Sequence, residues 1–341
     1  MTRKPMKRTT KTRTAITVIT LLSLVGLSAC SASGANGNSA EQRSVTLLAY
    51  DAFTPQEGIF EPFTADTGIE VKIVTGGDTG TLVSKAILTA GNPEADVLWG
   101  VDNTFLARVQ EADVLDTIEA VDTGDVCINI HDDYFENAGL RPPSSLADLI
   151  DPAYKNMLVV QDPRTSSPGL AFLLATIATF GESSWRDYWT QLRTNGVKVV
   201  SDWTTAYTVE FSGSTGKGSR PLVVSYGSSP PAEVLYSDPP VAEPPTSVME
   251  SSCFRQIEYV GRLKGTQRPH EADKLIEFLL GKTFQESMPL TLFVFPVNES
   301  AELPEVFEKF AVQPSNPLTI DADAIAANRE LWIEQWADSA L

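Results

Sequence analysis

Alternation of short apolar segments with amphipathic ones constrains the fold of this chain more than any other feature. From residue 44 to residue 112 the order is strand, helix, strand, helix, strand, helix. This order predicts a mainly parallel sheet with helices on both faces. In the second helix we expect Leu82, Ala86 and Leu88 to face inward. The predicted strands are residues 44–50, 69–74 and 95–99, and the predicted helices lie around residues 59–63 (ended by Gly68), 81–90 and 103–112.

A second alternating block begins at Asp125. Its predicted strands are residues 126–130, 157–160, 197–200 and 222–225, and its predicted helices lie near residues 146–150, 169–180 and 185–192. At roughly 150 residues per domain, 341 residues suit two lobes with separate cores. We expect the chain to cross between them at residues 126–130 and 254–259, and the Pro-rich residues 237–247 to form a surface loop.

The ends of these strands carry aromatic, carboxylate and small hydroxyl side chains. Ligands of such sheets bind where strand ends meet helix starts. Tyr50, Trp203 and Tyr226 all lie at such ends, although any one of them could instead belong to the core. Aromatic faces hold a desolvated cation, and a nearby carboxylate adds charge pairing. The pattern therefore favours an aromatic organic cation as ligand.

The first thirty residues predict export. Six basic residues and no acidic one precede an apolar stretch of residues 15–27, too short to span a bilayer. The stretch ends at Leu27-Ser28-Ala29-Cys30, which resembles a bacterial lipobox. We expect a signal peptide over residues 1–29, lipidation of Cys30 and a flexible tether over residues 30–42. The alternative is an ordinary signal peptide in which Cys30 falls by chance.

Charge and cysteine content narrow the function further. The formal net charge is −18, and removal of the six basic signal residues leaves 20 basic against 44 acidic residues, a net charge of −24. Binding to nucleic acid is therefore not expected. After Cys30, two cysteines remain in an exported chain, so we expect a disulfide between Cys127 and Cys253. Two unrelated buried thiols are the alternative.

No catalytic machinery is visible in the sequence. His131 and His270 are far apart and have no neighbours at zinc spacing, so we expect no metal site and no cofactor. The glycine-rich residues 213–219 lack the Ser or Thr that a phosphate loop requires after its lysine, and are interpreted as a flexible turn. No Ser/His/Asp set appears. We therefore expect a binding protein with no catalytic residues.

Several motifs together resemble the thiamine-binding proteins of ABC importers. In chain order they are Tyr50-Asp51-x-Phe53, Asp96-Val97-Leu98-x-Gly100-x-Asp102-Asn103, Asp162-Pro163-Arg164-Thr165-Ser166-x-Pro168-Gly169, Trp203-x-x-Ala206-Tyr207, Ser225-Tyr226-x-x-Ser229-Pro230 and Phe295-Pro296-Val297. The similarity spans nearly all of the mature chain.

This resemblance implies an α/β, two-lobed periplasmic-binding-protein fold of type II, like the ferric-ion-binding and spermidine-binding proteins, with the ligand in the interlobe cleft. Lobe 1 would comprise residues 43–125 and 255–298, lobe 2 residues 126–254, and residues 299–341 would form C-terminal helices packing on the lobes. The protein would act as a monomer at the outer face of the cell membrane or in the periplasm. Its partners would be thiamine or a thiamine phosphate and the permease and ATPase subunits of an importer.

The resemblance also implies roles for individual residues. Tyr50, Trp203, Tyr226 and Phe293 would sandwich the pyrimidine and thiazolium rings. Asp78 and Asp102 would lie at the cleft, and Asp51 beside Tyr50 belongs to the same expected site. Thr165 and Ser166 would take the hydroxyethyl or phosphate end, which the start of a helix at Pro168-Gly169 also favours.

Two departures from the family pattern affect the expected cleft. Thr123 stands where an aromatic residue is usual, in a segment between Leu115 and Asp125 that is short. Pro231-Ala232 stands where another aromatic residue is expected. The alternatives are a binding lipoprotein for ferric ion or a polyamine, and an exported thiamine-degrading enzyme. Ferric ion would need a Tyr-Tyr pair, which is missing, and the enzyme would need Cys127 as its nucleophile.

Overall fold

The structure is a computed structural model that describes residues 43–214 and 218–341. The predicted signal peptide, Cys30 and the tether lie outside the described residues, as do residues 215–217 of the glycine-rich turn. Within the described part of the chain, no helix has the length and apolar character needed to cross a membrane.

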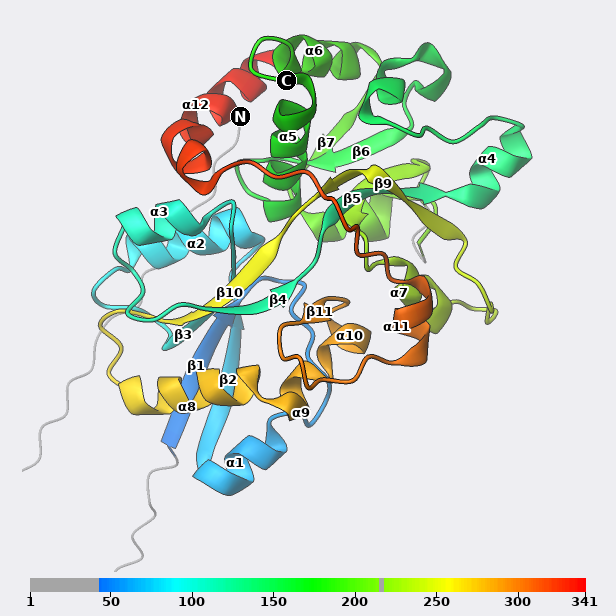
Figure 1. The fold of residues 1–341 in the computed structure, drawn as a ribbon. Coiled ribbons are helices and arrows are strands. Elements are labelled where there is room, and N and C mark those ends of the chain that lie inside the picture. The colour runs from blue at the N-terminus through cyan, green and yellow to red at the C-terminus, as the bar shows by residue number, and fades with distance from the viewer. Residues whose placement is uncertain (1–42, 215–217) are drawn as a thin grey trace, which may run out of the picture. The chain divides into compact units, whose positions relative to one another are not determined.

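Two sheets organise the described residues (Figure 1). In the first, the order is β11-β4-β10-β3-β1-β2, and β1 pairs in parallel with both β2 and β3, which confirms the predicted β-α-β-α-β unit. Its strands are β1 (Arg43–Ala49), β2 (Ile69–Thr75), β3 (Val97–Asp102), β4 (Glu119–Thr123), β10 (Ile257–Arg262) and β11 (Phe295–Pro296). The helices near it are α1 (Glu61–Thr67), α2 (Thr79–Leu88), α3 (Leu106–Glu111), α8 (Pro269–Leu280), α9 (Lys282–Gln285) and α10 (Met288–Thr291).

The second sheet has the order β7-β6-β8-β5-β9. Its strands are β5 (Val126–His131), β6 (Leu158–Gln161), β7 (Lys198–Val200), β8 (Leu222–Tyr226) and β9 (Thr246–Phe254). Its helices are α4 (Asp132–Ala138), the 3₁₀ turns η1 (Leu146–Ile150) and η2 (Pro152–Tyr154), α5 (Ser167–Phe180), α6 (Trp185–Thr194), the π-helix η3 (Thr205–Glu210) and α7 (Pro230–Leu235). These two sheets and their helices are the two lobes of an α/β fold.

Alternate side chains of β1 enter two different cores, as the pleat of a strand requires. Leu47 packs in one core with Leu275 of α8, whereas Leu48 packs in another with Leu82 and Ala86 of α2. Both faces of the first sheet are therefore covered, as expected for a parallel sheet.

Leu88 corrects the sequence prediction for α2. Leu82 and Ala86 are buried as expected, but Leu88 is 86% exposed. Six residues beyond Leu82, the helical repeat places Leu88 roughly 120° around the axis from the buried face. The third strand begins at Val97 and continues to Asp102, beyond its predicted end. The third helix begins later than predicted, because Asp102 accepts the backbone N–H groups of Thr104 and Phe105, at 3.1 Å each, just before α3.

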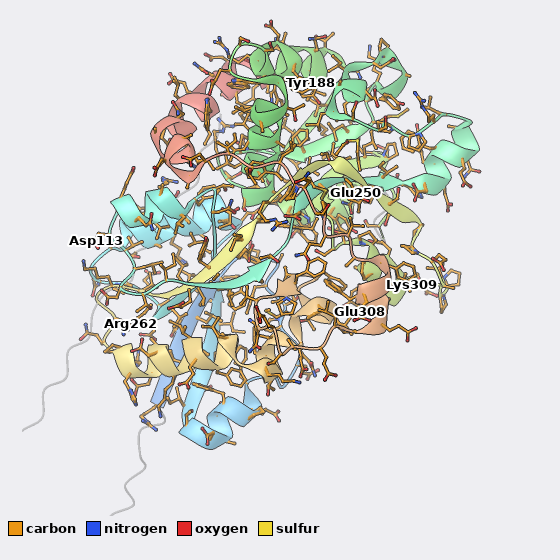
Figure 2. All side chains as sticks on the ribbon, in the orientation of Figure 1. Asp113, Tyr188, Glu250, Arg262, Glu308 and Lys309 are labelled. Carbon is orange, nitrogen blue, oxygen red and sulfur yellow. A yellow bond between two sulfur atoms is a disulfide. The ribbon has the colours of Figure 1, made fainter. Side chains whose placement is uncertain are left out.

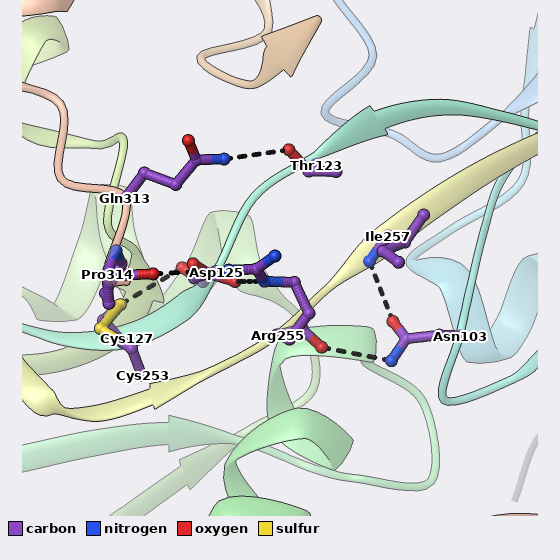
Figure 3. A network of polar contacts seen from close by, with 9 residues as sticks. All are labelled: Asn103, Thr123, Asp125, Cys127, Cys253, Arg255, Ile257, Gln313 and Pro314. Atoms are coloured by element: carbon purple, nitrogen blue, oxygen red, sulfur yellow. Dashed lines mark hydrogen bonds and ion pairs between the residues drawn. A yellow bond between two sulfur atoms is a disulfide. The ribbon is translucent and has the colours of Figure 1, made fainter. Parts of the chain in front are cut away.

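The chain crosses between the lobes at Gly124-Asp125 and at Arg255-Gln256, because β5 and β9 lie wholly in the second sheet. The first crossing lies just before the predicted residues 126–130, whereas the second falls within the predicted residues 254–259. Figure 3 shows the two crossings joined by an ion pair between Arg255 Nε and Asp125 Oδ1, at 2.6 Å. The predicted disulfide between Cys127 and Cys253 is confirmed on the adjacent strands β5 and β9.

The C-terminal helices α11 (Glu305–Phe310) and α12 (Ala322–Ala340) contact both lobes. The α12 helix packs on α6 and on α3, and its Arg329 lies over the Phe105 ring with 4.4 Å to the centroid. The α11 helix packs on α7, and its Lys309, labelled in Figure 2, pairs with Glu243 of the exposed Pro-rich loop at 2.8 Å.

Candidate functional site

A cavity of about 390 Å³ lies between the lobes and is lined by residues of both. The first lobe contributes the residues that follow β1 and β2, Glu258 of β10 and the segment before β11. The second lobe contributes Trp203 and the end of β8 with the adjoining α7. Aromatic side chains dominate the lining: they are Tyr50, Trp203, Tyr207, Tyr226, Tyr236 and Phe293. Three carboxyl residues, Asp78, Glu233 and Glu258, also line it.

Strand ends position several of these residues, as the sequence predicted. Tyr50 directly follows β1, Asp78 comes shortly after β2, and Tyr226 is the last residue of β8. Trp203 lies shortly after β7 at the start of a helical segment that continues into η3. Four predicted aromatic residues, Tyr50, Trp203, Tyr226 and Phe293, therefore meet in one cavity.

Trp203 is fixed on several sides. Its ring stacks on Tyr207 with 5.0 Å between centroids and 13° between planes. Its indole Nε1 donates to Ser225 Oγ at 3.0 Å, and its backbone N–H donates to Asp78 Oδ2 of the other lobe at 3.1 Å. The hydroxyl of Tyr207 donates to Glu233 Oε1 at 2.7 Å. These contacts hold the two rings rigid before any ligand arrives, which lowers the ordering cost of binding.

The opposite side of the cavity is built around Phe293. Its φ of 54° places a bulky residue in the left-handed region, where the surroundings must hold it. Its N–H donates to the Met288 carbonyl at 3.0 Å, and its carbonyl accepts Ser228 Oγ from the second lobe at 2.6 Å. The Tyr236 ring meets the Phe293 ring edge-on at 6.0 Å.

The sequence did not predict Tyr236 as a site residue. Its ring compensates for the aromatic residue that is absent at Pro231-Ala232. Ala232 lines the cavity where an aromatic residue was expected, and Tyr236, the residue after α7, supplies a ring instead. Thr123 does not line the cavity, and its Oγ1 accepts Gln313 Nε2 at 3.5 Å (Figure 3). Tyr207 was quoted only within a motif, although its spacing of four from Trp203 predicts contact on a helix.

Two buried carboxyl residues, Glu258 and Asp122, lie beside Tyr50, and we call them the acidic wall. Glu258 of β10 is 4% exposed and pairs across the sheet with Asp122 of β4, which is fully buried. Burial and the neighbouring charges of Asp122 and Asp102 raise the pKa of Glu258 well above its usual value. Burial raises the pKa of Asp122 to about 8. The Tyr50 hydroxyl donates to Glu258 Oε2 at 3.3 Å, and burial beside that carboxyl raises the pKa of Tyr50.

Asp78 joins the lobes at the cavity edge. Its Oδ1 caps α2 by accepting the Thr79 N–H at 2.8 Å, while its Oδ2 reaches Trp203. Burial raises the pKa of Asp78, and hydrogen bonding from Ser166 opposes that shift. Next to it the Gly80 N–H donates to the Thr165 carbonyl at 2.9 Å, and a Cβ on Gly80 would lie 2.7 Å from the Arg164 carbonyl oxygen. The lobes therefore touch backbone to backbone here.

Four predicted site residues do not line this cavity. Asp51 lines an adjoining hollow of about 300 Å³ that shares Tyr50, Asp78 and Trp203 with it. Asp102 is buried between the lobes, where it accepts Ser167 Oγ and, at 3.0 Å, Gln256 Nε2. Thr165 donates its hydroxyl to the Ser201 carbonyl at 2.6 Å, and Ser166 is fully buried at the start of α5.

The helix start predicted for a phosphate is thus enclosed by the contact between the lobes. The first turn of α5 is buried, and its Ser167 Oγ donates to Asp102 of the first lobe. Thr165 and Ser166 build the interlobe contact and stand apart from the cavity lining.

Two lobes joined by two crossings of the chain, with an aromatic cavity between them, define a protein that encloses a small solute. The chain belongs to the family of bacterial extracellular solute-binding proteins, whose match covers residues 94–328. It is 28% identical over 310 residues to the thiamine-binding periplasmic protein of Salmonella typhimurium, covering 86% of this chain and 92% of that protein. The thiamine-binding periplasmic protein of Brucella suis is also 28% identical, over 315 residues, with 86% and 91% covered.

Solved structures agree in fold. A periplasmic thiamin binding protein superimposes with a TM-score of 0.77 at 26% identity, covering 87% of this chain and 96% of that one. Iron-bound HitA from Pseudomonas aeruginosa, at 19% identity and a TM-score of 0.68, shares the fold.

Proposed function

We propose that this protein captures thiamine outside the cytoplasm and delivers it to an ABC importer. The observation that carries the proposal is the cavity itself, where six aromatic side chains and three carboxyl residues surround one space. Thiamine combines a flat aminopyrimidine with a permanently charged thiazolium, so it gains from stacking, cation–π contact and charge pairing together. The relatives named for thiamine binding are similar over most of this chain.

Within the cavity, we assign ligand contact to Tyr50, Asp78, Trp203, Tyr226 and Phe293, and add Tyr207 and Tyr236. Asp51 borders the adjoining hollow, and Asp102, Thr165 and Ser166 stabilise the contact between the lobes. The division into lobes at residues 125 and 254 follows the membership of the two sheets. We further propose that the protein acts as a monomer. We also propose that it is not an enzyme, because the disulfide removes the Cys127 thiol that the enzyme alternative required.

A polyamine is the remaining alternative ligand. It would use the carboxyl residues but leave the stacked rings without a flat partner. Calorimetric titration with thiamine and with spermidine separates the two. We expect thiamine to bind and spermidine to bind at least about tenfold more weakly, because a flexible chain forgoes the stacking contribution of roughly 0.5 to 2 kcal/mol per ring. Equal affinities would overturn the assignment to thiamine.

Phosphorylation of the ligand is expected to weaken binding. The described lining holds Asp78, Glu233 and Glu258 and no Lys or Arg, and the predicted phosphate site at Thr165 and Ser166 is enclosed. A phosphate group would therefore approach carboxyl groups in a poorly solvated space. We expect thiamine monophosphate to bind about tenfold more weakly than thiamine, or weaker still, since each 1.4 kcal/mol of repulsion is tenfold.

Titration of both ligands against wild type and Ser166→Ala checks this preference. The Ser166→Ala variant should change both affinities in the same proportion, because Ser166 does not line the cavity. If Ser166→Ala selectively loses affinity for the monophosphate, or if wild type binds the monophosphate more tightly than thiamine, the phosphate group binds at the start of α5 after all.

Membrane attachment is proposed from the lipobox at Cys30. We expect Cys30→Ser to remove lipid labelling and shift the protein from the membrane fraction to the soluble fraction or leave it unprocessed, because the thiol is the lipid acceptor. Radiolabelled palmitate incorporation and cell fractionation measure this. Ser31→Ala is the matched control and should stay attached. A normally cleaved Cys30→Ser protein that remains on the membrane contradicts the anchor.

A further inference from the structure

The acidic wall of the cavity, Asp122 and Glu258, is unusual because it places two buried carboxyl groups next to each other. Buried carboxylates are normally paired with cations or saturated with hydrogen bonds. Among the described residues, neither carboxyl oxygen of Asp122 receives an N–H or O–H donor, and Asp122 is fully buried. Its cross-strand partner is Glu258, so the two buried side chains lie on the same face of the pair β4–β10. Two adjacent buried carboxyl groups without a cation cannot both ionise at low cost, so the empty pair keeps a proton.

The other groups that act on the pair offer it no positive charge. After burial itself, the charges of Asp122, Asp102 and Asp78 raise the pKa of Glu258, and the hydrogen bond from Tyr50 opposes the shift. Its neutral hydrogen-bond partners are Tyr50 and, at 3.5 Å, Gln256. Burial, followed by the charges of Glu258, Asp78 and Asp102, raises the pKa of the Tyr226 hydroxyl at the end of β8. On β3, β4, β10 and β11 the other charged residues are Asp102, Glu119 and Arg262, and Arg262 is already paired with Asp116 and Asp273. These strands therefore leave the pair without a compensating cation.

Glu258 lines the cavity and Asp122 stands behind it. We infer that the Asp122–Glu258 carboxyl pair recognises the positive charge of the ligand and releases its shared proton to solvent when the cation enters. The inference rests on the proposed function and deepens it. As the proton leaves, the pair passes from one negative charge to two, and the cation in the cavity offsets the added charge.

Proton release has a direct consequence for affinity. Because the empty protein holds a proton that the complex lacks, a rise in pH favours the complex. The thiazolium nitrogen is quaternary, so the ligand's own charge does not change. Displacement of one proton gives up to about a tenfold gain in affinity per pH unit. We expect the gain between pH 6 and 8 and a flatter curve once the pair is ionised.

Calorimetry of wild-type protein with thiamine tests this without any variant. Titrations at pH 6, 7 and 8, each in two buffers of different ionisation enthalpy, give the number of protons released per ligand. We expect release of between half a proton and one proton at pH 7, since one shared proton is displaced. The neutral analogue with thiophene in place of thiazolium, 3-deazathiamine, should bind without proton release and without pH dependence.

Three variants locate the effect. Glu258→Gln should lower the affinity for thiamine by about tenfold or more at pH 8 and should abolish proton release. It should change the affinity for 3-deazathiamine by less than about threefold. Asp122→Asn supplies an amide donor to Glu258, so it should abolish proton release and the pH dependence while thiamine still binds. Glu119→Gln is the control, because Glu119 lies on β4 with Asp122 but is exposed and does not line the cavity. It should retain proton release.

The outcomes separate the inference from the function. Wild-type protein that binds thiamine with no proton release and no pH dependence overturns the inference alone. So does a Glu258→Gln variant that keeps the full preference for thiamine over 3-deazathiamine. Failure of wild type to bind thiamine at all overturns the proposed function, and the inference with it.

Discussion

Reduction of the Cys127–Cys253 disulfide is expected to lower the free energy of unfolding by about 4 to 5 kcal/mol, the chain-entropy value for a loop of this size. The two cysteines are 126 residues apart in sequence and are joined on neighbouring strands β5 and β9. Both are buried in the native protein. The loss should therefore come from the freedom regained by the unfolded chain and should appear as a lower melting temperature.

Thiamine affinity should change much less than stability, because neither cysteine lines the cavity. Thermal unfolding and calorimetry with and without reductant measure the two effects side by side. A protein carrying both Cys127→Ser and Cys253→Ser is the control for the reductant, since its melting temperature should not respond. Two free thiols in the mass spectrum of the native protein, or a loss of affinity that matches the loss of stability, contradict this expectation.

The aromatic residues of the cavity that lie at strand ends could be predicted from the local sequence pattern and the parallel topology that it implies. The alternation of strands and helices implies parallel strands, and parallel strands end at one edge of a sheet. The placement of Tyr50 and Tyr226 at the site follows from that rule alone. The disulfide follows from the predicted export and from the even number of remaining cysteines. None of these inferences required knowledge of how the two lobes meet.

The start of α5 shows where such reasoning fails. A helix beginning with Pro168 and Gly169 presents free N–H groups if it faces solvent, and the sequence contains nothing that says whether it does. In the structure the backbone of Gly80 meets Thr165 from the other lobe, and this contact encloses the helix start. A site formed by two lobes depends on pairwise contacts between distant segments, and local patterns do not carry them.

The acidic wall was missed for a related reason. A carboxylate within a strand usually marks the solvent face, so Glu258 and Asp122 each read as surface residues. Their burial follows from the antiparallel pairing of β10 with β4, which brings them together from distant parts of the chain. Two acidic residues whose segments pair across a sheet become informative only when that pairing is known.

Trp203→Ala is expected to weaken thiamine binding by about 1 to 3 kcal/mol, which is about one to two decades in affinity. The indole lines the cavity, stacks on Tyr207 and lies 6.4 Å from the Tyr226 ring between centroids. Removing it deletes one aromatic face and leaves a gap that water can enter. Calorimetric titration with thiamine measures the loss, and circular dichroism checks that the fold is retained.

Two further variants separate the ring from its support. Trp203→Phe keeps an aromatic face and gives up the 3.0 Å bond from Nε1 to Ser225, so it should lose much less affinity than Trp203→Ala. Ser225→Ala removes the acceptor of that bond and leaves the indole itself in place, and Ser225 does not line the cavity. If Ser225→Ala weakens thiamine as much as Trp203→Ala does, the indole acts through its hydrogen bond. If Trp203→Ala binds thiamine as tightly as wild type does, the ring makes no contact with the ligand, and the aromatic cavity loses its place as the physical basis of a thiamine site.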